Sequence, residues 1–314
     1  LFRFFWAASR KQERRSPGRV DPPMNDSDIR AVPQTDADYP HILLQIKDPP
    51  RTLYVRGDLS CLHAPCLAVV GTRKMTPYGK AVLGELIPPV AAAGITIVSG
   101  LALGVDGEGH RQTLLSGGRT AAVLGSGVRP QDVTPVSHQQ LAEEMLMHGG
   151  ALVSEYPAGT PSLPYHFPTR NRILSGLCRA TLVIEASIKS GTLITARHAL
   201  DQGRDVLAVP GDILRESAGG PNLLINEGAR PVTSAADILE ALGIDAQHGP
   251  DVIRPHAPLT DAARALFPHL SREPIHIDAL ARAAKLPAAV VSEALLIMEL
   301  RGQVRHLGGQ MYRL

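Results

Sequence analysis

The chain has 314 residues, 44% apolar and 20% charged, and this length and composition predict about two domains with ordinary cores. Its formal net charge is +2, but residues 1–20 carry +5 and residues 21–314 therefore sum to −3. This distribution excludes a global positive field, so any nucleic-acid binding needs a local patch. No apolar run approaches the ~20 residues that span a bilayer, and we expect a cytoplasmic protein without membrane contact.

The three cysteines are too few and too unevenly spaced for a disulfide framework. Cys61 and Cys66 enclose His63, but no second pair of ligands follows at zinc-site spacing. We therefore expect reduced thiols and no metal.

The N-terminal segment mixes aromatic and basic side chains, as in LFRFFWAASRKQERRS. We predict that residues 1–38 form a disordered or reduced N-terminal extension. Residues 1–23, which precede Met24, are expected to be disordered or to lie upstream of the natural start.

From Leu53 onward, short apolar strands alternate with helical segments. Such alternation predicts a mainly parallel sheet covered on both faces, a Rossmann-like doubly wound α/β domain over residues 39–242. In the helix expected from Tyr78 to Ala93, Pro88 and Pro89 should kink the helix or end it early. The strands are expected at residues 53–57, 66–73, 95–100, 120–127, 151–156, 181–186 and 205–211.

The composition changes after Leu242. Residues 243–258 contain Pro, Gly and His without an apolar period and are predicted to be a linker. Residues 259–314 predict three helices and a hairpin around Gly308 and Gly309, the pattern of a small winged-helix domain. The third helix, Ala288–Leu300, has no Arg, Lys, Asn or Gln near its start, so we expect a protein contact or weak backbone binding rather than base reading.

Polar and glycine-rich turns follow the expected parallel strands, where ligands of such sheets bind. Arg73 follows the first buried strand, which predicts a phosphate contact; a surface ion pair is the alternative. The turn SGLALG opens a helix, and its amides can cradle a phosphate. No dinucleotide fingerprint is present, so a nicotinamide enzyme is disfavoured.

The segment FPTRNR offers a ring for base stacking and cations for phosphates. Arg170 and Arg172 point to different sides of a helix, so we expect one to reach a ligand and the other to pair with Glu155 or Glu185. A structural ion-pair cluster with Phe167 in the core is the alternative.

A second polar turn, SIKSGT, places polar groups at the start of another helix. The residues are Lys189, Ser190, Gly191 and Thr192. They suit an anion, although capping by Ser190 or Thr192 would also explain them. The turn lacks the G-x-x-x-x-G-K-[ST] form of an ATP-hydrolysing loop.

Taken in order, VVGTRKMTPYG, IVSGLALGVDGEGH, SEYPAGTP, FPTRNRILSG and VIEASIKSGTLITARHALDQGRDVLAVPG resemble the DNA-processing DprA (Smf) family. The resemblance implies a Rossmann-like domain that binds single-stranded DNA without sequence preference and needs no cofactor. It also implies protection of incoming DNA in natural transformation, loading of the recombinase RecA, and a homodimer through the Rossmann-like domain.

The resemblance also implies site residues. Phosphates would be held by Arg73, Ser99 and Gly100, the path of the strand would be lined by Phe167, Arg170, Asn171 and Arg172, and the pocket would be completed by Lys189, Ser190, Gly191 and Thr192. The chain departs from the family pattern at Leu103, where an arginine is usual, and this puts one basic contact in doubt.

Two other functions stay open beside a non-catalytic DNA-binding protein. A nucleoside-monophosphate phosphoribohydrolase of the lysine-decarboxylase-like fold would need an acid where this chain has Thr195. A winged-helix transcription regulator would need a stronger recognition helix than Ala288–Leu300.

Overall fold

The computed structural model describes residues 28–244, 260–271, 273–300 and 304–313. The chain divides into two compact units, residues 1–250 and residues 251–314. The linker predicted at 243–258 lies almost entirely outside the described residues.

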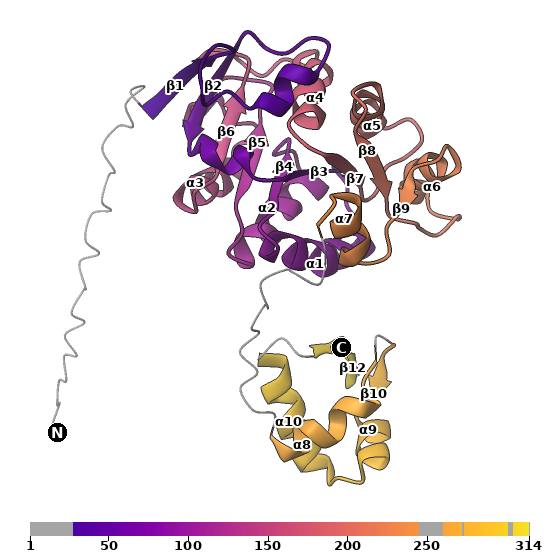
Figure 1. Cartoon of the computed structure of the whole chain (residues 1–314). Coiled ribbons are helices and arrows are strands. Elements are labelled where there is room, and N and C mark those ends of the chain that lie inside the picture. The colour runs from indigo at the N-terminus through magenta and orange to yellow at the C-terminus, as the bar shows by residue number, and fades with distance from the viewer. Residues whose placement is uncertain (1–27, 245–259, 272, 301–303, 314) are drawn as a thin grey trace, which may run out of the picture. The chain divides into compact units, whose positions relative to one another are not determined.

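The larger unit is built on a nine-stranded sheet in the order β1-β2-β6-β5-β4-β3-β7-β8-β9 (Figure 1). The strands from β6 to β9 in this order pair in parallel, whereas β2 pairs antiparallel with both β1 and β6. This arrangement confirms the mainly parallel, Rossmann-like prediction. The strands are β1 Ile29–Pro33, β2 Thr52–Gly57, β3 Cys66–Val70, β4 Thr96–Ser99, β5 Thr120–Val123, β6 Ala151–Ser154, β7 Ala180–Val183, β8 Asp205–Ala208 and β9 Arg230–Pro231.

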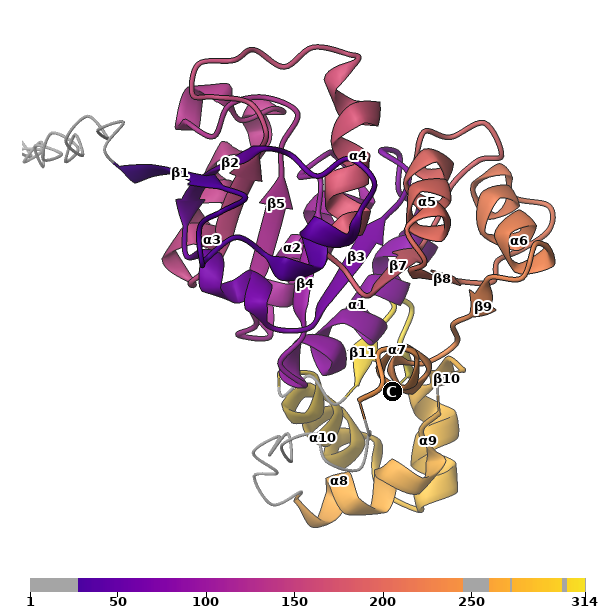
Figure 2. The same cartoon turned by 45° about the horizontal axis from the view of Figure 1, so that its top comes forward.

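Helices cover both faces of this sheet (Figures 1 and 2). Helices α4, α5 and α6 pack with one set of strand side chains, and α1, α3 and α7 pack with the opposite set. The helices are α1 Pro77–Ala92, α2 Val105–Leu115, α3 Gln139–Met147, α4 His166–Gly176, α5 Thr192–Asp201, α6 Gly219–Asn226 and α7 Ala235–Ala241. Short 3₁₀ turns include η2 His41–Gln45, η3 Leu59–His63 and η5 Val136–His138.

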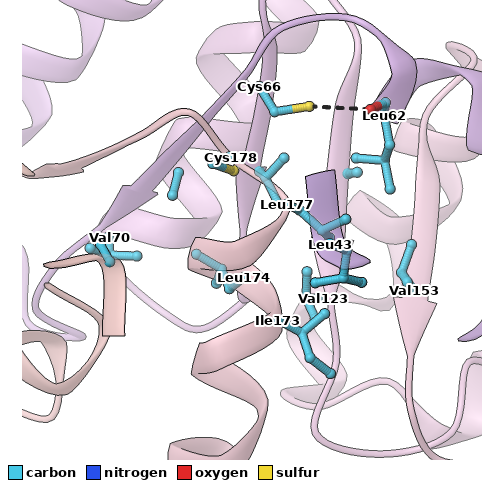
Figure 3. Packing of buried hydrophobic residues seen from close by; sticks show 14 of the residues in the cluster. Leu43, Leu62, Cys66, Val70, Val123, Val153, Ile173, Leu174, Leu177 and Cys178 are labelled. Atoms are coloured by element: carbon cyan, nitrogen blue, oxygen red, sulfur yellow. Dashed lines mark hydrogen bonds between the residues drawn. The ribbon is translucent and has the colours of Figure 1, made fainter. Parts of the chain in front are cut away.

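The core below α4 is aliphatic and closely packed. Figure 3 shows Ile173 and Leu174 of α4 near Leu43 of η2 and near Val123 of the sheet. In the same cluster the thiol of Cys66 lies 3.9 Å from the carbonyl oxygen of Leu62. Burial raises the pKa of Cys66 to about 12, so this thiol stays neutral.

Helix α1 continues through Pro88 and Pro89 to Ala92, so the predicted early end is wrong. Pro89 is exposed, whereas Leu86, Ile87 and Val90 are buried. Packing against the core therefore holds the apolar face of the helix. The prolines leave two backbone carbonyls without N–H donors, and these carbonyls lie on the more exposed side of the helix, where water can donate to them.

The sheet extends further toward the N-terminus than the sequence indicated. Strand β1 lies inside the range predicted to be an extension, and it pairs antiparallel with β2. Val32 is its one fully buried side chain. An edge strand with so few buried residues leaves almost no alternation for a sequence pattern to detect.

The described residues of the smaller unit form three α-helices and a three-stranded sheet, as a winged helix requires. Its helices pack around Leu266, Leu280 and Leu295. The predicted hairpin is present, and a further strand, β10, joins it. The elements are α8 Asp261–Leu266, β10 Ile275–His276, α9 Ile277–Ala284, α10 Ala288–Leu300, β11 Arg305–His306 and β12 Met311–Arg313.

Candidate nucleic-acid interface

A groove of about 520 Å³ opens at the carboxyl ends of β3 and β7. The strand order reverses at this pair, because β4 lies on one side of β3 and β7 on the other. Ligands of open α/β sheets bind at such a switch point. The groove is lined by residues 70–73 after β3, Ala102 and Asp106 after β4, Pro164, Phe167, Pro168, Arg170, Asn171 and Leu174 around α4, and Ser190, Gly191, Thr192, Ile194 and Thr195 at the start of α5.

Arg73 and Phe167 form one wall of this groove. The guanidinium carbon of Arg73 lies 5.4 Å from the centroid of the Phe167 ring. Arg73 is exposed and Phe167 is half-buried, with Gly125 against the ring. A cation held over a ring places a phosphate contact beside a stacking surface.

Arg170 lies buried at the floor of the groove. Its Nη1 donates to the carbonyl oxygen of Gly100 over 3.3 Å, and its Nε donates to Oδ1 of Asn171 over 3.3 Å. Burial lowers the pKa of Arg170 to about 10, partly offset by Asp106, so the side chain remains a cation near neutral pH. A cation this poorly hydrated attracts an incoming phosphate strongly.

Asp106 is the one carboxylate among the described residues that line the groove. Burial raises its pKa, whereas Arg170 and the amide of Gly100, which donates to Oδ2 over 3.0 Å, act in the opposite direction. Asp106 is therefore held by the turn beneath the groove and by the neighbouring Arg170 cation.

The start of α5 forms the opposite wall. Ser190 accepts the amide N–H of Thr192 over 3.2 Å and donates to the Thr192 hydroxyl over 3.0 Å. The N-cap of α5 is Gly191, which makes no side-chain cap hydrogen bond, so neither Ser190 nor Thr192 caps this helix, and both line the groove. Lys189 is exposed beside them but does not line it.

Ser99 and Gly100 are buried beneath the groove and do not line it. The Ser99 hydroxyl donates to the carbonyl of Val69 over 2.6 Å, and the Gly100 amide is bonded to Asp106. Ser99 and Gly100, both predicted as phosphate ligands, therefore support the groove from beneath and do not line it.

Arg172 points away from the groove. Its Nη2 donates to Oε2 of Glu155 over 2.7 Å, and Nε lies 3.4 Å from Oδ2 of Asp48. Of the two carboxylates expected as partners for the second arginine of FPTRNR, Glu155 is the one that Arg172 meets. Glu185 instead accepts the amide and hydroxyl of Thr76 and the hydroxyl of Ser217.

Several residues that line or support the groove were not predicted from the sequence. Leu174 and Ile194 line the groove through helix faces that look like ordinary core. The helix that contains FPTRNR starts at His166 and includes Pro168, because a proline is tolerated in the first turn. His138 touches the SGL turn from 37 residues away, and no local pattern signals such a contact.

The described residues contain no group of three or more His, Cys, Asp or Glu side chains placed to hold a metal. No helix within the described ranges is long and apolar enough to cross a membrane.

The family model for DNA recombination-mediator protein A matches residues 30–243, and the model for the DprA winged-helix domain matches residues 250–310. The chain belongs to the DprA (Smf) family. Protein Smf of Escherichia coli is 40% identical over 289 residues, which cover 90% of this chain and 77% of that protein. The DNA processing protein DprA of Bacillus subtilis is 42% identical over 225 residues, covering 71% of this chain and 75% of its own.

Solved structures of the DprA family agree with the fold. The X-ray structure of DprA from Streptococcus pneumoniae superposes with a TM-score of 0.64 at 38% identity, covering 69% of this chain and 78% of that one. DNA processing protein A from Helicobacter pylori, studied for its single-stranded DNA binding mode, gives a TM-score of 0.61 at 27% identity, covering 68% and 95%. Leu103, at the position where the resemblance predicts an arginine, is 47% exposed, so the turn presents an apolar side chain there.

Proposed function

We propose that this chain is a non-catalytic protein that binds single-stranded DNA without sequence preference and acts in DNA processing during natural transformation. The observation that carries the proposal is the pairing of Arg73, after β3, with Phe167 of α4, in the same groove as the buried Arg170. The single-stranded DNA binding of the Helicobacter pylori relative supports the same ligand.

The groove's chemistry favours a strand of any sequence. Every base has a face that can stack on a ring, and every nucleotide has a phosphate for a cation. The cations come from α4 and from the turn after β3, and the small residues Ser190 and Gly191 let a backbone approach α5.

The hydrolase alternative gains no support from the groove. The position where such an enzyme would need an acid is Thr195, which is buried and lines the groove. Asp106, the carboxylate present, accepts the Gly100 amide and lies beside Arg170. We therefore propose no catalytic role.

We further propose that the chain protects incoming DNA, acts as a homodimer through its Rossmann-like domain, and loads RecA onto the bound strand. Membership of the DprA family supports these proposals. Mass photometry would test the dimer, and RecA filament growth on a strand precoated with single-strand-binding protein would test the loading.

The deciding experiment is fluorescence anisotropy of the full chain with labelled single-stranded and duplex oligonucleotides of equal length over a salt series. We expect tight, sequence-indifferent binding to single strands that weakens as salt rises. Equal affinity for duplex would overturn the proposal, and release of free base from nucleoside monophosphates would then be assayed.

A further inference from the structure

Gly100 and Leu101, directly after β4, form an unusual turn beneath the groove. Leu101 has a φ of +57°, in the left-handed region that residues other than glycine rarely adopt. Its side chain is fully buried against α3, among Leu141 and Met145. A strained backbone of this kind persists only where its surroundings hold it firmly.

One side chain from a distant segment bonds this turn. Nδ1 of His138, at the junction of η5 and α3, lies 2.9 Å from the carbonyl oxygen of Leu101. The carbonyl can only accept, so Nδ1 carries the proton and donates it. His138 is 3% exposed, and a Cβ at Gly107 would clash with its ring, so the imidazole has little room to move.

The next carbonyl back along the chain contacts the groove's cation. Gly100 accepts from Nη1 of Arg170, and its amide donates to Asp106. The Arg170 guanidinium therefore donates to the carbonyl of Gly100, and the next carbonyl along the chain, that of Leu101, is held by His138. A rotation of the Leu101 peptide would tilt the Gly100 carbonyl away from Arg170.

We propose that His138 is a positioning residue for the DNA groove: it holds the Leu101 carbonyl, and through the turn it sets the direction of the Arg170 guanidinium. This inference rests on the proposed function, because it assumes that Arg170 meets the phosphates of a bound strand. His138 itself does not line the groove.

The donor position suggests matched variants. The side-chain amide of asparagine can occupy the place of Nδ1, whereas leucine fills the space without donating, and glutamine places its amide nearer to Nε2. His138→Asn should therefore preserve the bond to Leu101, while His138→Leu and His138→Gln should lose it.

The test measures single-strand affinity by anisotropy for the full-length variants, with thermal unfolding followed in parallel. His138→Leu should weaken binding about tenfold, as expected for a buried hydrogen bond that is left unmade. The affinity of His138→Asn should stay close to that of the parent. His138→Gln should weaken binding as His138→Leu does, and it replaces His138→Leu in the test if the leucine variant fails to fold.

A double-mutant cycle separates positioning from general damage. In an Arg170→Ala background, His138→Leu should have almost no further effect on affinity, because the group it positions is gone. In an Arg73→Ala background its effect should persist in full. The same tenfold loss in both backgrounds, or equal affinities for the asparagine and leucine variants, would overturn the inference.

The two proposals fail in different ways. If neither Arg170→Ala nor Arg73→Ala changes single-strand affinity, the groove is not the binding site and the proposed function loses its basis. If both weaken binding while folded His138→Leu or His138→Gln does not, the positioning role alone is wrong.

Discussion

The groove and helix α10 offer very different surfaces to a nucleic acid. The groove combines Arg73, Phe167 and a buried Arg170 within one hollow. The outward face of α10 carries Ser292, Glu293 and Glu299, and Leu296 is 57% exposed on it. A winged-helix arrangement therefore does not by itself make a base-reading surface, since the side chains of its third helix decide that.

The comparison also explains why the local charge matters more than the total. The chain as a whole has a net charge of only +2, yet cations converge at the groove where the strand order reverses. Low-dielectric walls around Arg170 strengthen its field. We expect the groove variants to affect DNA binding strongly and the variants of the smaller unit to affect it weakly.

The largest effect on affinity is expected for Arg170→Ala. Loss of a buried, charge-assisted phosphate contact costs about 1.5–3 kcal/mol, equivalent to roughly 10–150-fold in affinity. Anisotropy with a single-stranded oligonucleotide would measure it, and circular dichroism would show that the fold remains. An affinity within twofold of the parent would remove Arg170 from the interface.

Arg172→Met is expected to act on stability instead. It leaves Glu155 without its partner in a mostly buried site and should lower the free energy of unfolding by about 2 kcal/mol. Urea denaturation would measure this change. Because Arg172 points away from the groove, single-strand affinity should change less than twofold. A tenfold loss of affinity without a loss of stability would place Arg172 in the DNA path after all.

Phe167→Ala should weaken single-strand binding by about 1–3 kcal/mol, the value of one base stacked on a ring. Stacking releases no counterions, so the slope of log affinity against log salt should stay the same. A salt series on the variant and its parent would measure both quantities. A slope that became shallower by about one unit would indicate a lost phosphate contact rather than a lost stacking surface.

Arg73→Ala should have a smaller effect on affinity, because Arg73 is exposed and its phosphate contact is screened by water and salt. We expect about a fivefold loss and a salt slope shallower by roughly 0.7, as for one phosphate contact on a single strand. The matched control is Lys74→Ala, an exposed neighbour that does not line the groove. Equal losses for the two variants would mean that only general charge matters.

How far the sequence could anticipate this site depends on the range of the interactions. Residues 70–73 and the start of α5 follow apolar strands directly, so their place at the sheet edge could be predicted from the chain alone. The roles of Ser99 and Gly100 could not, because their amide and hydroxyl groups are bonded to Asp106 and Val69 in the folded chain. Which of the two FPTRNR arginines faces the groove depends on Glu155, a partner 17 residues away from Arg172.

The smallest change is expected for Arg282→Ala combined with Lys285→Ala in the winged-helix unit. Both residues are exposed near the end of α9, and an exposed cation outside a groove adds only a screened, non-specific attraction. Single-strand affinity should therefore fall less than twofold, well below the effect of either groove arginine. A loss as large as that of Arg170→Ala, with the same salt dependence, would reverse the comparison and assign the main phosphate contacts to the smaller unit. The oligonucleotide's length would then matter: a strand too short to reach both units should lose its sensitivity to one set of variants and keep its sensitivity to the other.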